Sequence, residues 1–383
     1  MKSTKSILIL LLINSFHFLS FSQILGIENL SRYKKVLENK NIGLVVNHAS
    51  QIENTHLVDT LLELEINISV IFSPEHGFSG AFNAGEYVKD THYKDSIPII
   101  SLYGAYKKPS VDHLENIDII VFDIQDVGVR FYTYLSTLHY VMEACAEQGV
   151  TLLLLDRPNP HTDYVDGPVL ELTYSSFVGL HPVPIIYGMT IGEYALMING
   201  ERWLRGEQTC SLKIIKMESY SRSDMIDFKF PPSPNLPTMH SVLLYPSLCL
   251  FEGTLISVGR GTDYPFEVYG APFLNSAFSF YPEPNFGSKE PKYNGQLCYG
   301  VDLRQNVNQY YDKINLEFLI NAYNSSSSDY KNIFFNNFFN KLAGNDELQW
   351  QILNNLGEDK IRESWVNDID SFLLIREKYL LYD

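Results

Sequence analysis

Glu75 and His76 are the two neighbouring side chains whose types and position are best suited to chemistry. They follow the apolar run at 68–72 and Pro74, which cannot donate a backbone hydrogen bond to a sheet. A carboxyl group at the exit of a strand could protonate a leaving oxygen, as glycoside hydrolysis requires. Glu75 could instead cap the following turn. For His76 we favour a supporting role beside Glu75 over a chemical one.

Further polar side chains follow other apolar runs that we expect to form strands. Because the carboxyl ends of parallel strands share one edge of a sheet, these groups should converge near Glu75. They are His48 after 42–46, Asp123 and Asp126 after 117–122, and Asp156, Arg157 and Asn159 after 152–155.

Asp123 and Asp126 could supply a second carboxylate, acting as the nucleophile or the base of a glycosidase. Together with His48 and His76 they could alternatively hold a hard divalent ion. The sequence has no H-x-H, H-E-x-x-H or other recognisable ligand spacing, so we assign no metal and no cofactor. A structural alternative for Asp126 is an ion pair with Arg130.

Arginines and aromatic residues complete the set of candidates for substrate binding. An arginine fork could hold a carboxylate-bearing substrate, although Arg130 and Arg157 could equally pair with a neighbouring aspartate. Tyr132 could stack on the face of a sugar. The loop-rich stretch from 231 to 267 adds Asn235, Glu252 and Arg260 as expected rim residues, with Glu252 as the reserve catalytic acid.

The order of the predicted elements indicates an α/β fold. Apolar runs alternate with segments of helical periodicity, which predicts a Rossmann-like parallel sheet with helices on both faces. One helix begins at Tyr134 and stops at Gly149, and another opens with the capping box Thr190–Glu193. Neither G-x-G-x-x-G nor a P-loop is present, so a dinucleotide site is not expected.

We divide the chain into three parts. Residues 1–22 have the features of a signal peptide, with Lys2 and Lys5 before a short apolar core and a small-x-small tripeptide at 20–22. Residues 23–268 form the expected Rossmann-like catalytic domain, and residues 269–383 a smaller α+β domain with helices near 315–324 and 346–379. The chain should therefore be exported, to a bacterial periplasm or beyond the cell.

Charge and cysteine usage exclude several classes of protein. The net charge of −16 becomes −18 when the two lysines of the signal peptide are removed, which disfavours binding to nucleic acid. The apolar core of the signal peptide is too short to span a bilayer, and no cysteine follows it, so no stable membrane anchor is expected. The four cysteines contain no C-x-x-C pair, and Cys145 falls on a buried helical stripe.

Several stretches read together resemble the NamZ family of exo-β-N-acetylmuramidases. They are PEHGFSG at 74–80, SLYG at 101–104, VFDIQDVGVRFYTY at 121–134, LDRPNP at 155–160, GMTIGEYA at 188–195, SPN at 233–235, FEGT at 251–254, GRGTDYPFE at 259–267 and REKYLLY at 376–382. The resemblance runs from about residue 43 to the C-terminus.

This resemblance implies release of terminal N-acetylmuramic acid from the non-reducing ends of peptidoglycan fragments. It also implies that Glu75, the acid of the PEHG stretch, is the catalytic residue. Two alternatives compete with this reading: a metal-dependent amidase or deacetylase that acts on wall fragments, and a non-catalytic periplasmic protein that binds glycans.

Overall fold

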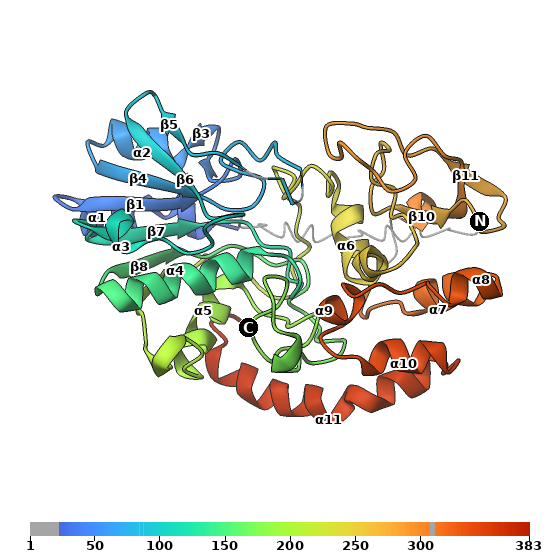
Figure 1. The fold of residues 1–383 in the computed structure, drawn as a ribbon. Helices are drawn as coiled ribbons and strands as arrows, with labels where there is room; N and C mark the ends of the chain where they lie inside the picture. The colour runs from blue at the N-terminus through green and yellow to red at the C-terminus, as the bar shows by residue number, and fades with distance from the viewer. Residues whose placement is uncertain (1–22, 84, 87, 307–310) are drawn as a thin grey trace, which may run out of the picture.

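A seven-stranded sheet forms the centre of the N-terminal part of the protein (Figure 1). This computed structural model describes residues 23–383 apart from 84, 87 and 307–310, so the expected signal peptide lies outside the described residues. All neighbouring strands pair in parallel except β5 and β6. In spatial order the strands are β5 (Thr91–Tyr93), β6 (Ile97–Ser101), β4 (Asn67–Ser73), β1 (Asn41–Val46), β7 (Ile119–Asp123), β8 (Thr151–Leu155) and β9 (Ser211–Ile215).

The parallel strands have the order of a Rossmann fold. Counted along the chain, the six of them lie in the order 3-2-1-4-5-6, which reverses at β1. In open sheets of this kind, ligands bind outside the carboxyl ends of the strands, near the reversal. Glu75 and Asp123 lie at the ends of β4 and β7, the two neighbours of β1. The expectation of a Rossmann-like parallel sheet is therefore confirmed.

Helices cover both faces of this sheet, as expected. Alternate residues of each strand face opposite sides, so Val121 packs in one cluster of buried side chains and Phe122 in the other. On the Val121 side the sheet is covered by α1 (Leu30–Leu37) and α2 (Leu57–Glu63). On the Phe122 side it is covered by α3 (Val111–Leu114), α4 (Tyr134–Gln148) and α5 (Ile191–Gly200).

The predicted limits of two helices are confirmed. Gly149 adopts φ 68° at the end of α4, a conformation that glycine accepts without strain. Thr190 and Glu193 form the capping box at the start of α5. Among the described helices, none is both long and apolar enough to cross a membrane.

The C-terminal part combines a small antiparallel sheet with helices, which confirms the predicted α+β character. The sheet has the order β10-β12-β11. One continuous core joins this part to the parallel sheet, since Leu138 of α4 belongs to the same cluster as Phe251 and Leu342. The elements are β10 (Val268–Ala271), β11 (Phe278–Phe280), β12 (Cys298–Asp302), α7 (Glu317–Asn324), α8 (Ser328–Lys331), α9 (Phe339–Ala343), α10 (Glu347–Leu353) and α11 (Glu358–Arg376).

The stretch 231–267, expected to be loops, contains the helix α6 (Met239–Leu248). Pro246 argued against a helix there, because proline inside a helix removes a hydrogen bond. Here it lies in the last turn, and the capping box of Thr238 and Ser241 starts the helix. The edge strand β5 and the hairpin of β2 (Gln51–Ile52) and β3 (Thr55–His56) are further elements that the sequence pattern did not predict.

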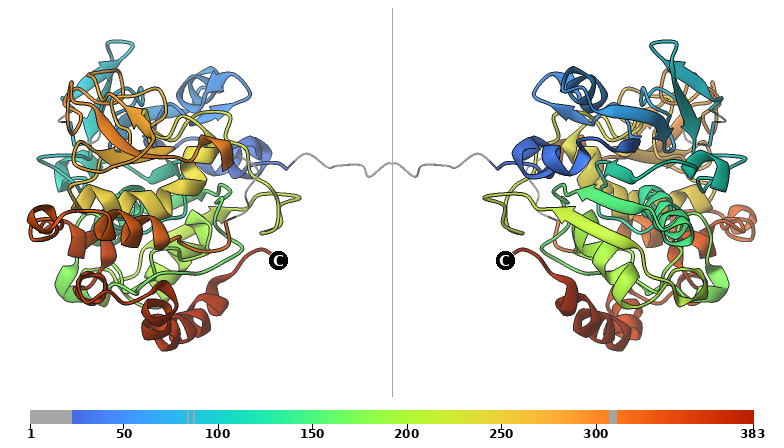
Figure 2. Two further views of the ribbon diagram at one scale, coloured as in Figure 1. Left: turned by 90° about the vertical axis from the view of Figure 1, so that its right-hand side faces the viewer. Right: turned by 90° about the vertical axis from the view of Figure 1, so that its left-hand side faces the viewer.

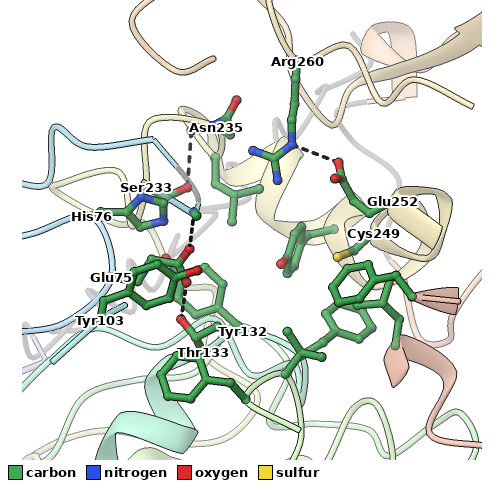
Figure 3. Close-up of a pocket in the computed structure, with 18 of the residues that line it drawn as sticks. Glu75, His76, Tyr103, Tyr132, Thr133, Ser233, Asn235, Cys249, Glu252 and Arg260 are labelled. Atoms are coloured by element: carbon green, nitrogen blue, oxygen red, sulfur yellow. Dashed lines mark hydrogen bonds and ion pairs between the residues drawn. The ribbon is translucent and has the colours of Figure 1, made fainter. Parts of the chain in front are cut away.

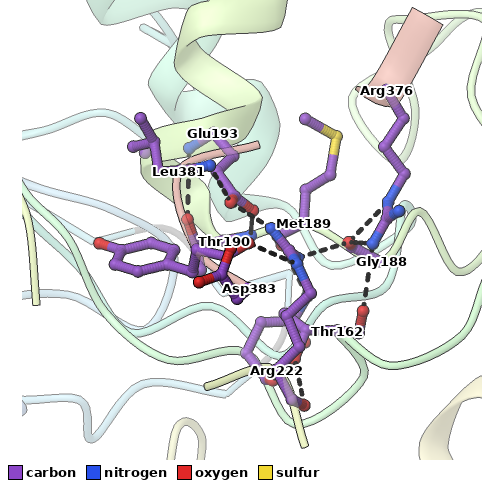
Figure 4. Close-up of polar contacts among 12 residues, drawn as sticks. Thr162, Gly188, Met189, Thr190, Glu193, Arg222, Arg376, Leu381 and Asp383 are labelled. Atoms are coloured by element: carbon purple, nitrogen blue, oxygen red, sulfur yellow. Dashed lines mark hydrogen bonds and ion pairs between the residues drawn. The ribbon is translucent and has the colours of Figure 1, made fainter. Parts of the chain in front are cut away.

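After α11 the chain turns back toward the parallel sheet (Figure 2). The Tyr382 hydroxyl donates to Asp156 Oδ2 at 2.7 Å, and the Leu381 N–H donates to Glu193 Oε1 at 2.6 Å. Arg376 donates from Nη2 to the Gly188 carbonyl at 2.6 Å (Figure 4). The last residues of the chain therefore complete polar contacts at the start of α5.

Candidate active site

A cavity of about 520 Å³ lies between the carboxyl edge of the parallel sheet and the helices α6 and α9. Its lining combines two acids and two cations with many aromatic rings. Figure 3 shows the acids Glu75 and Glu252 and the cation Arg260 around the cavity. Aromatic rings offer large apolar faces of the kind that sugars stack on. The aromatic lining residues are Tyr103, Phe131, Tyr132, Phe177, Tyr245, Phe266 and Phe338.

Glu75 lies in this cavity and its carboxylate is held at both oxygens. Thr133 Oγ1 donates to Oε2 at 2.6 Å, and the Gly85 N–H donates to Oε1 at 2.9 Å. The side chain is 7 % exposed. Tyr103 is a further neighbour, and its pKa is raised by burial and then by the charge of Glu75. Two fixed donors give the carboxyl group one orientation toward the cavity.

Thr133 is a residue that the sequence did not identify as functional. It is the N-cap of α4, yet its hydroxyl makes no capping bond and donates to Glu75 instead. The N-terminus of α4 also brings its positive dipole end close to the carboxylate. The position of Thr133 next to Tyr132 could have indicated a functional role. A threonine immediately before a helix is, however, expected to be an N-cap residue. Tyr245 and Phe338 were also missed, because only the tertiary fold brings them to the cavity.

His76 supports the turn that carries Glu75. Its backbone has φ 70°, and its Nδ1 lies 2.7 Å from the Phe82 carbonyl oxygen. Because a carbonyl only accepts, Nδ1 is the donor and Nε2 is left as an acceptor. Burial lowers the pKa of His76, which keeps the ring neutral.

Arg260 and Glu252 form an ion pair on the other side of the cavity (Figure 3), with Nε and Oε1 2.9 Å apart. Burial raises the pKa of Glu252, but the charges of Arg260 and Lys292 outweigh it and hold that pKa below its usual value. Arg260 also lies over the ring of Phe266, 5.0 Å from its centroid. Its two terminal amino groups make no hydrogen bond or ion pair with described residues.

Asp123 and Asp126 do not line this cavity. Asp123 is fully buried and accepts two hydrogen bonds from Arg157, at 2.7 Å each. Asp126 accepts from the Gly128 N–H at 2.7 Å and from the Tyr187 hydroxyl. Burial raises the pKa of Asp126 to about 6. The carboxyl ends of the strands do converge, but these acids are engaged with the protein itself.

Arg130 holds the backbone of distant segments together. Its Nη1 donates to the carbonyls of Pro168 and Val183, and its Nη2 to those of Leu342 and Ala343. The guanidinium is buried, which lowers its pKa to about 9. The ion pair considered between Arg130 and Asp126 does not form, because all of these acceptors are carbonyls.

The structure therefore divides the candidates into two groups. Lining the cavity are Glu75, His76, Tyr132, Asn235, Glu252 and Arg260. Outside it are His48, Asp123, Asp126, Arg130, Asp156, Arg157 and Asn159, which bind other parts of the protein. Among the described residues, no three of His, Cys, Asp and Glu gather as metal ligands would.

A Rossmann-type sheet with an oriented acid in a largely aromatic cavity at its carboxyl edge is typical of the active site of an α/β enzyme. Two family models, described as the N-terminal and C-terminal parts of exo-beta-N-acetylmuramidase NamZ, match residues 42–240 and 243–382. The chain belongs to the NamZ family. The two models meet between 240 and 243, ahead of the domain limit at 268 that we expected.

Known relatives match nearly the whole chain. The peptidoglycan beta-N-acetylmuramidase NamZ of Bacillus subtilis (strain 168) is 40 % identical over 380 residues, which cover 91 % of this chain and 89 % of the relative. Crystal structures of two DUF1343 family proteins from Bacteroides fragilis NCTC 9343 match with TM-scores of 0.86 and 0.81 at 42 % and 28 % identity. Each match covers 94 % of this chain and 99 % of the chain in the crystal structure.

Proposed function

We propose that this protein is an exo-acting glycoside hydrolase that removes terminal N-acetylmuramic acid from the non-reducing ends of peptidoglycan fragments. The family and the name of the Bacillus subtilis relative support this substrate. The observation that carries the mechanism is the carboxyl group of Glu75, oriented by Thr133 and Gly85 within an aromatic cavity.

Glu75 acts as the general acid in this mechanism. It transfers its proton to the glycosidic oxygen while the bond between that oxygen and the anomeric carbon breaks. The bonds from Thr133 and Gly85 fix the direction of proton transfer. His76, neutral and bound to the Phe82 carbonyl, holds the turn in place and leaves the proton transfer to Glu75.

Two routes for the second step fit the lining of the cavity, where Glu75 and Glu252 are the only carboxylates among the described residues. In an inverting reaction, Glu252 activates a water molecule on the far side of the sugar. In a retaining reaction, the acetamido oxygen of the substrate attacks the anomeric carbon as the bond to the leaving oxygen breaks, and water then opens the cyclic intermediate from the face that the leaving group occupied. NMR of the first-formed anomer separates the two: α first means inversion and β first means retention.

Arg260 recognises the lactyl carboxylate that distinguishes muramic acid from glucosamine. Its terminal amino groups make no hydrogen bond with the described residues, so they can bind a carboxylate with two parallel hydrogen bonds. In a protein with a net charge of −16, such a local cation is needed to attract an anionic sugar.

A pair of chromogenic substrates tests this function directly. The 4-nitrophenyl β-glycosides of N-acetylmuramic acid and N-acetylglucosamine differ only in the lactyl ether. We expect cleavage of the muramide at a rate at least about 100-fold above that of the glucosaminide, as one charge-assisted pair can provide. Equal cleavage of both would contradict the role of Arg260, and cleavage of neither would contradict the function.

The location of the protein is part of the same proposal. Peptidoglycan fragments lie outside the cytoplasm, and the first 22 residues have the composition of a signal peptide. Mass spectrometry of the mature protein from its native host should find Gln23 at the N-terminus. A mature chain that retains Met1 would contradict export by this route.

A further inference from the structure

A second cavity, of about 440 Å³, adjoins the first. The two share three lining residues, Gly85, Glu252 and Arg260. The remaining residues of the second cavity come from two separate segments of the chain: Asn83 and Glu86 from the loop after β4, and Gly287, Ser288, Lys289 and Glu290 from the loop between β11 and β12.

Glu75 lines the first cavity, next to its junction with the second. The Gly85 N–H that donates to Glu75 Oε1 belongs to a residue that lines both of them. A general acid must stand beside the oxygen that joins the retained sugar to the leaving group. This junction is therefore the natural position for the bond that breaks, with one part of the glycan on each side.

The two linings have different chemistry. The first cavity is rich in aromatic rings, whereas the described residues that line the second include no aromatic side chain. The second is lined by charged groups, an amide, a hydroxyl and backbone. Such a surface suits hydroxyl groups that exchange hydrogen bonds with protein and with water. It therefore fits a sugar that binds and departs more readily than it fits an apolar ligand.

Asn83 presents an unpaired acceptor in this region. Its N–H and its Nδ2 both donate to Glu86 Oε2, at 3.1 and 2.9 Å, which fixes the orientation of the amide. Its Oδ1 is buried and makes no hydrogen bond with the part of the chain that the structure describes. Because this oxygen has almost no exposed surface, a sugar hydroxyl reaches it only when the Asn83 side chain turns toward the cavity. A buried acceptor without a partner is costly, so a ligand that donates to it then gains affinity.

Glu86 and Lys289 close the outer side of the second cavity. Their charged atoms lie 2.5 Å apart and join the loop after β4 to the C-terminal part of the protein. The bonds from Lys289 and then from Asn83 lower the pKa of Glu86 to about 2. The carboxylate is thus ionised over the working pH range and keeps both of its partners.

We propose that the second cavity binds the leaving portion of the glycan, with Asn83 Oδ1 accepting a hydrogen bond from that sugar and the Glu86–Lys289 ion pair forming the outer wall. This inference rests on the proposed function and adds a binding site for the part of the substrate beyond the cleaved bond.

Two substrates with different leaving groups test this assignment. The disaccharide of N-acetylmuramic acid β-1,4-linked to N-acetylglucosamine fills both cavities, whereas N-acetylmuramyl β-fluoride releases a single atom and fills only the first. Asn83→Ala should lower kcat/KM for the disaccharide about 5- to 10-fold and leave that for the fluoride within about twofold. Asn340→Ala is the matched control, because Asn340 Oδ1 is also buried without a partner among the described residues, and Asn340 lines neither cavity. It should change neither value.

Lys289→Met provides an independent variant with its own control. We expect about a threefold loss on the disaccharide alone, since exposed ion pairs contribute little energy by themselves. Lys94→Met removes a comparable ion pair with Asp59, at 2.6 Å, and should have no effect: the Lys94 side chain is 64 % exposed against 69 % for Lys289.

Three outcomes would overturn the assignment. Equal losses on both substrates would mean that this loop only orients Glu75. Unchanged kinetics of Asn83→Ala on both substrates would mean that the leaving sugar does not reach Asn83. Wild-type protein that cleaves neither substrate would overturn the proposed function together with this inference.

Discussion

From the sequence, Arg130 and Arg157 were candidate carboxylate binders and Arg260 was an expected rim residue; hydrogen bonding separates the three. Arg157 donates hydrogen bonds to Asp123 and to the Ala49 carbonyl. Arg130 donates from its terminal amino groups to four carbonyls. Among the described residues, the Arg260 side chain donates only from Nε, to Glu252. We therefore assign recognition of the anionic substrate to Arg260, whose terminal amino groups make no hydrogen bond with described residues.

Replacing Glu75 with Gln tests the proton donor. The amide keeps the shape of the side chain and cannot transfer the proton, so we expect kcat on the disaccharide to fall by about 10²- to 10⁴-fold. The melting temperature should change little. Glu63→Gln, at an exposed position of α2, is the control for charge. Near-normal turnover of Glu75→Gln would show that Glu75 is not the general acid.

Replacing Arg260 with Met tests specificity rather than chemistry. A lost charge-assisted pair should reduce kcat/KM for the muramide by about 10- to 100-fold and leave the slow cleavage of the glucosaminide unchanged. Arg304→Met, which breaks the ion pair with Asp302 outside both cavities, should alter neither. If kcat/KM falls equally for both substrates, Arg260 maintains the structure of the site and does not bind the lactyl carboxylate.

At the scale of elements, sequence patterns located the strand exits but not what the polar groups there contact. Glu75 and Asp123 both follow a buried strand beside β1, and nothing in the local pattern distinguishes them. Their hydrogen-bond partners differ: Asp123 accepts from the neighbouring Arg157, whereas Glu75 accepts from Thr133 and Gly85. Helix limits at Gly149 and Thr190 were predictable, because capping depends on neighbouring residues.

The loop after β7 should make stability depend on pH through Asp126. Burial raises its pKa to about 6 in the folded protein, against about 3.9 in an unfolded chain. Between those values the folded state keeps a proton that the unfolded state has lost, so this contribution to stability declines as pH rises from 4 to 6. The free energy of unfolding of Asp126→Asn, taken relative to that of the wild type, should therefore rise by about 2–3 kcal/mol between pH 4 and pH 7.5. Denaturant unfolding of both proteins at several pH values measures it, and parallel curves would contradict the shift.

At the scale of the whole molecule, the two parts of the chain that the family models match share one hydrophobic core. The cluster that begins on the Phe122 face of the sheet continues through α4 and α6 to Phe372 of α11. The chain end returns to Asp156 and to the start of α5. The cavity that holds Glu75 lies where the two parts pack, so its shape depends on their remaining joined.

This continuity predicts that the protein unfolds as one unit, with Arg130 as a main link. Arg130 joins the loops at Pro168 and Val183 to the end of α9, whose Leu342 also lines the cavity. Arg130→Met leaves four buried carbonyls without their donor, which should cost about 3 kcal/mol or more and lower the melting temperature by about 4 °C. Arg205→Met, at an exposed position, is the control.

Calorimetry of residues 23–383 decides between one cooperative unit and two. A single transition, with equal calorimetric and van't Hoff enthalpies, is expected for the wild type. Because the core residues of both parts pack against each other, Arg130→Met should shift this transition as a whole and reduce turnover through displacement of Leu342. Two separate transitions in the wild type would mean that the parts fold independently and that the active-site cavity can open without unfolding either one.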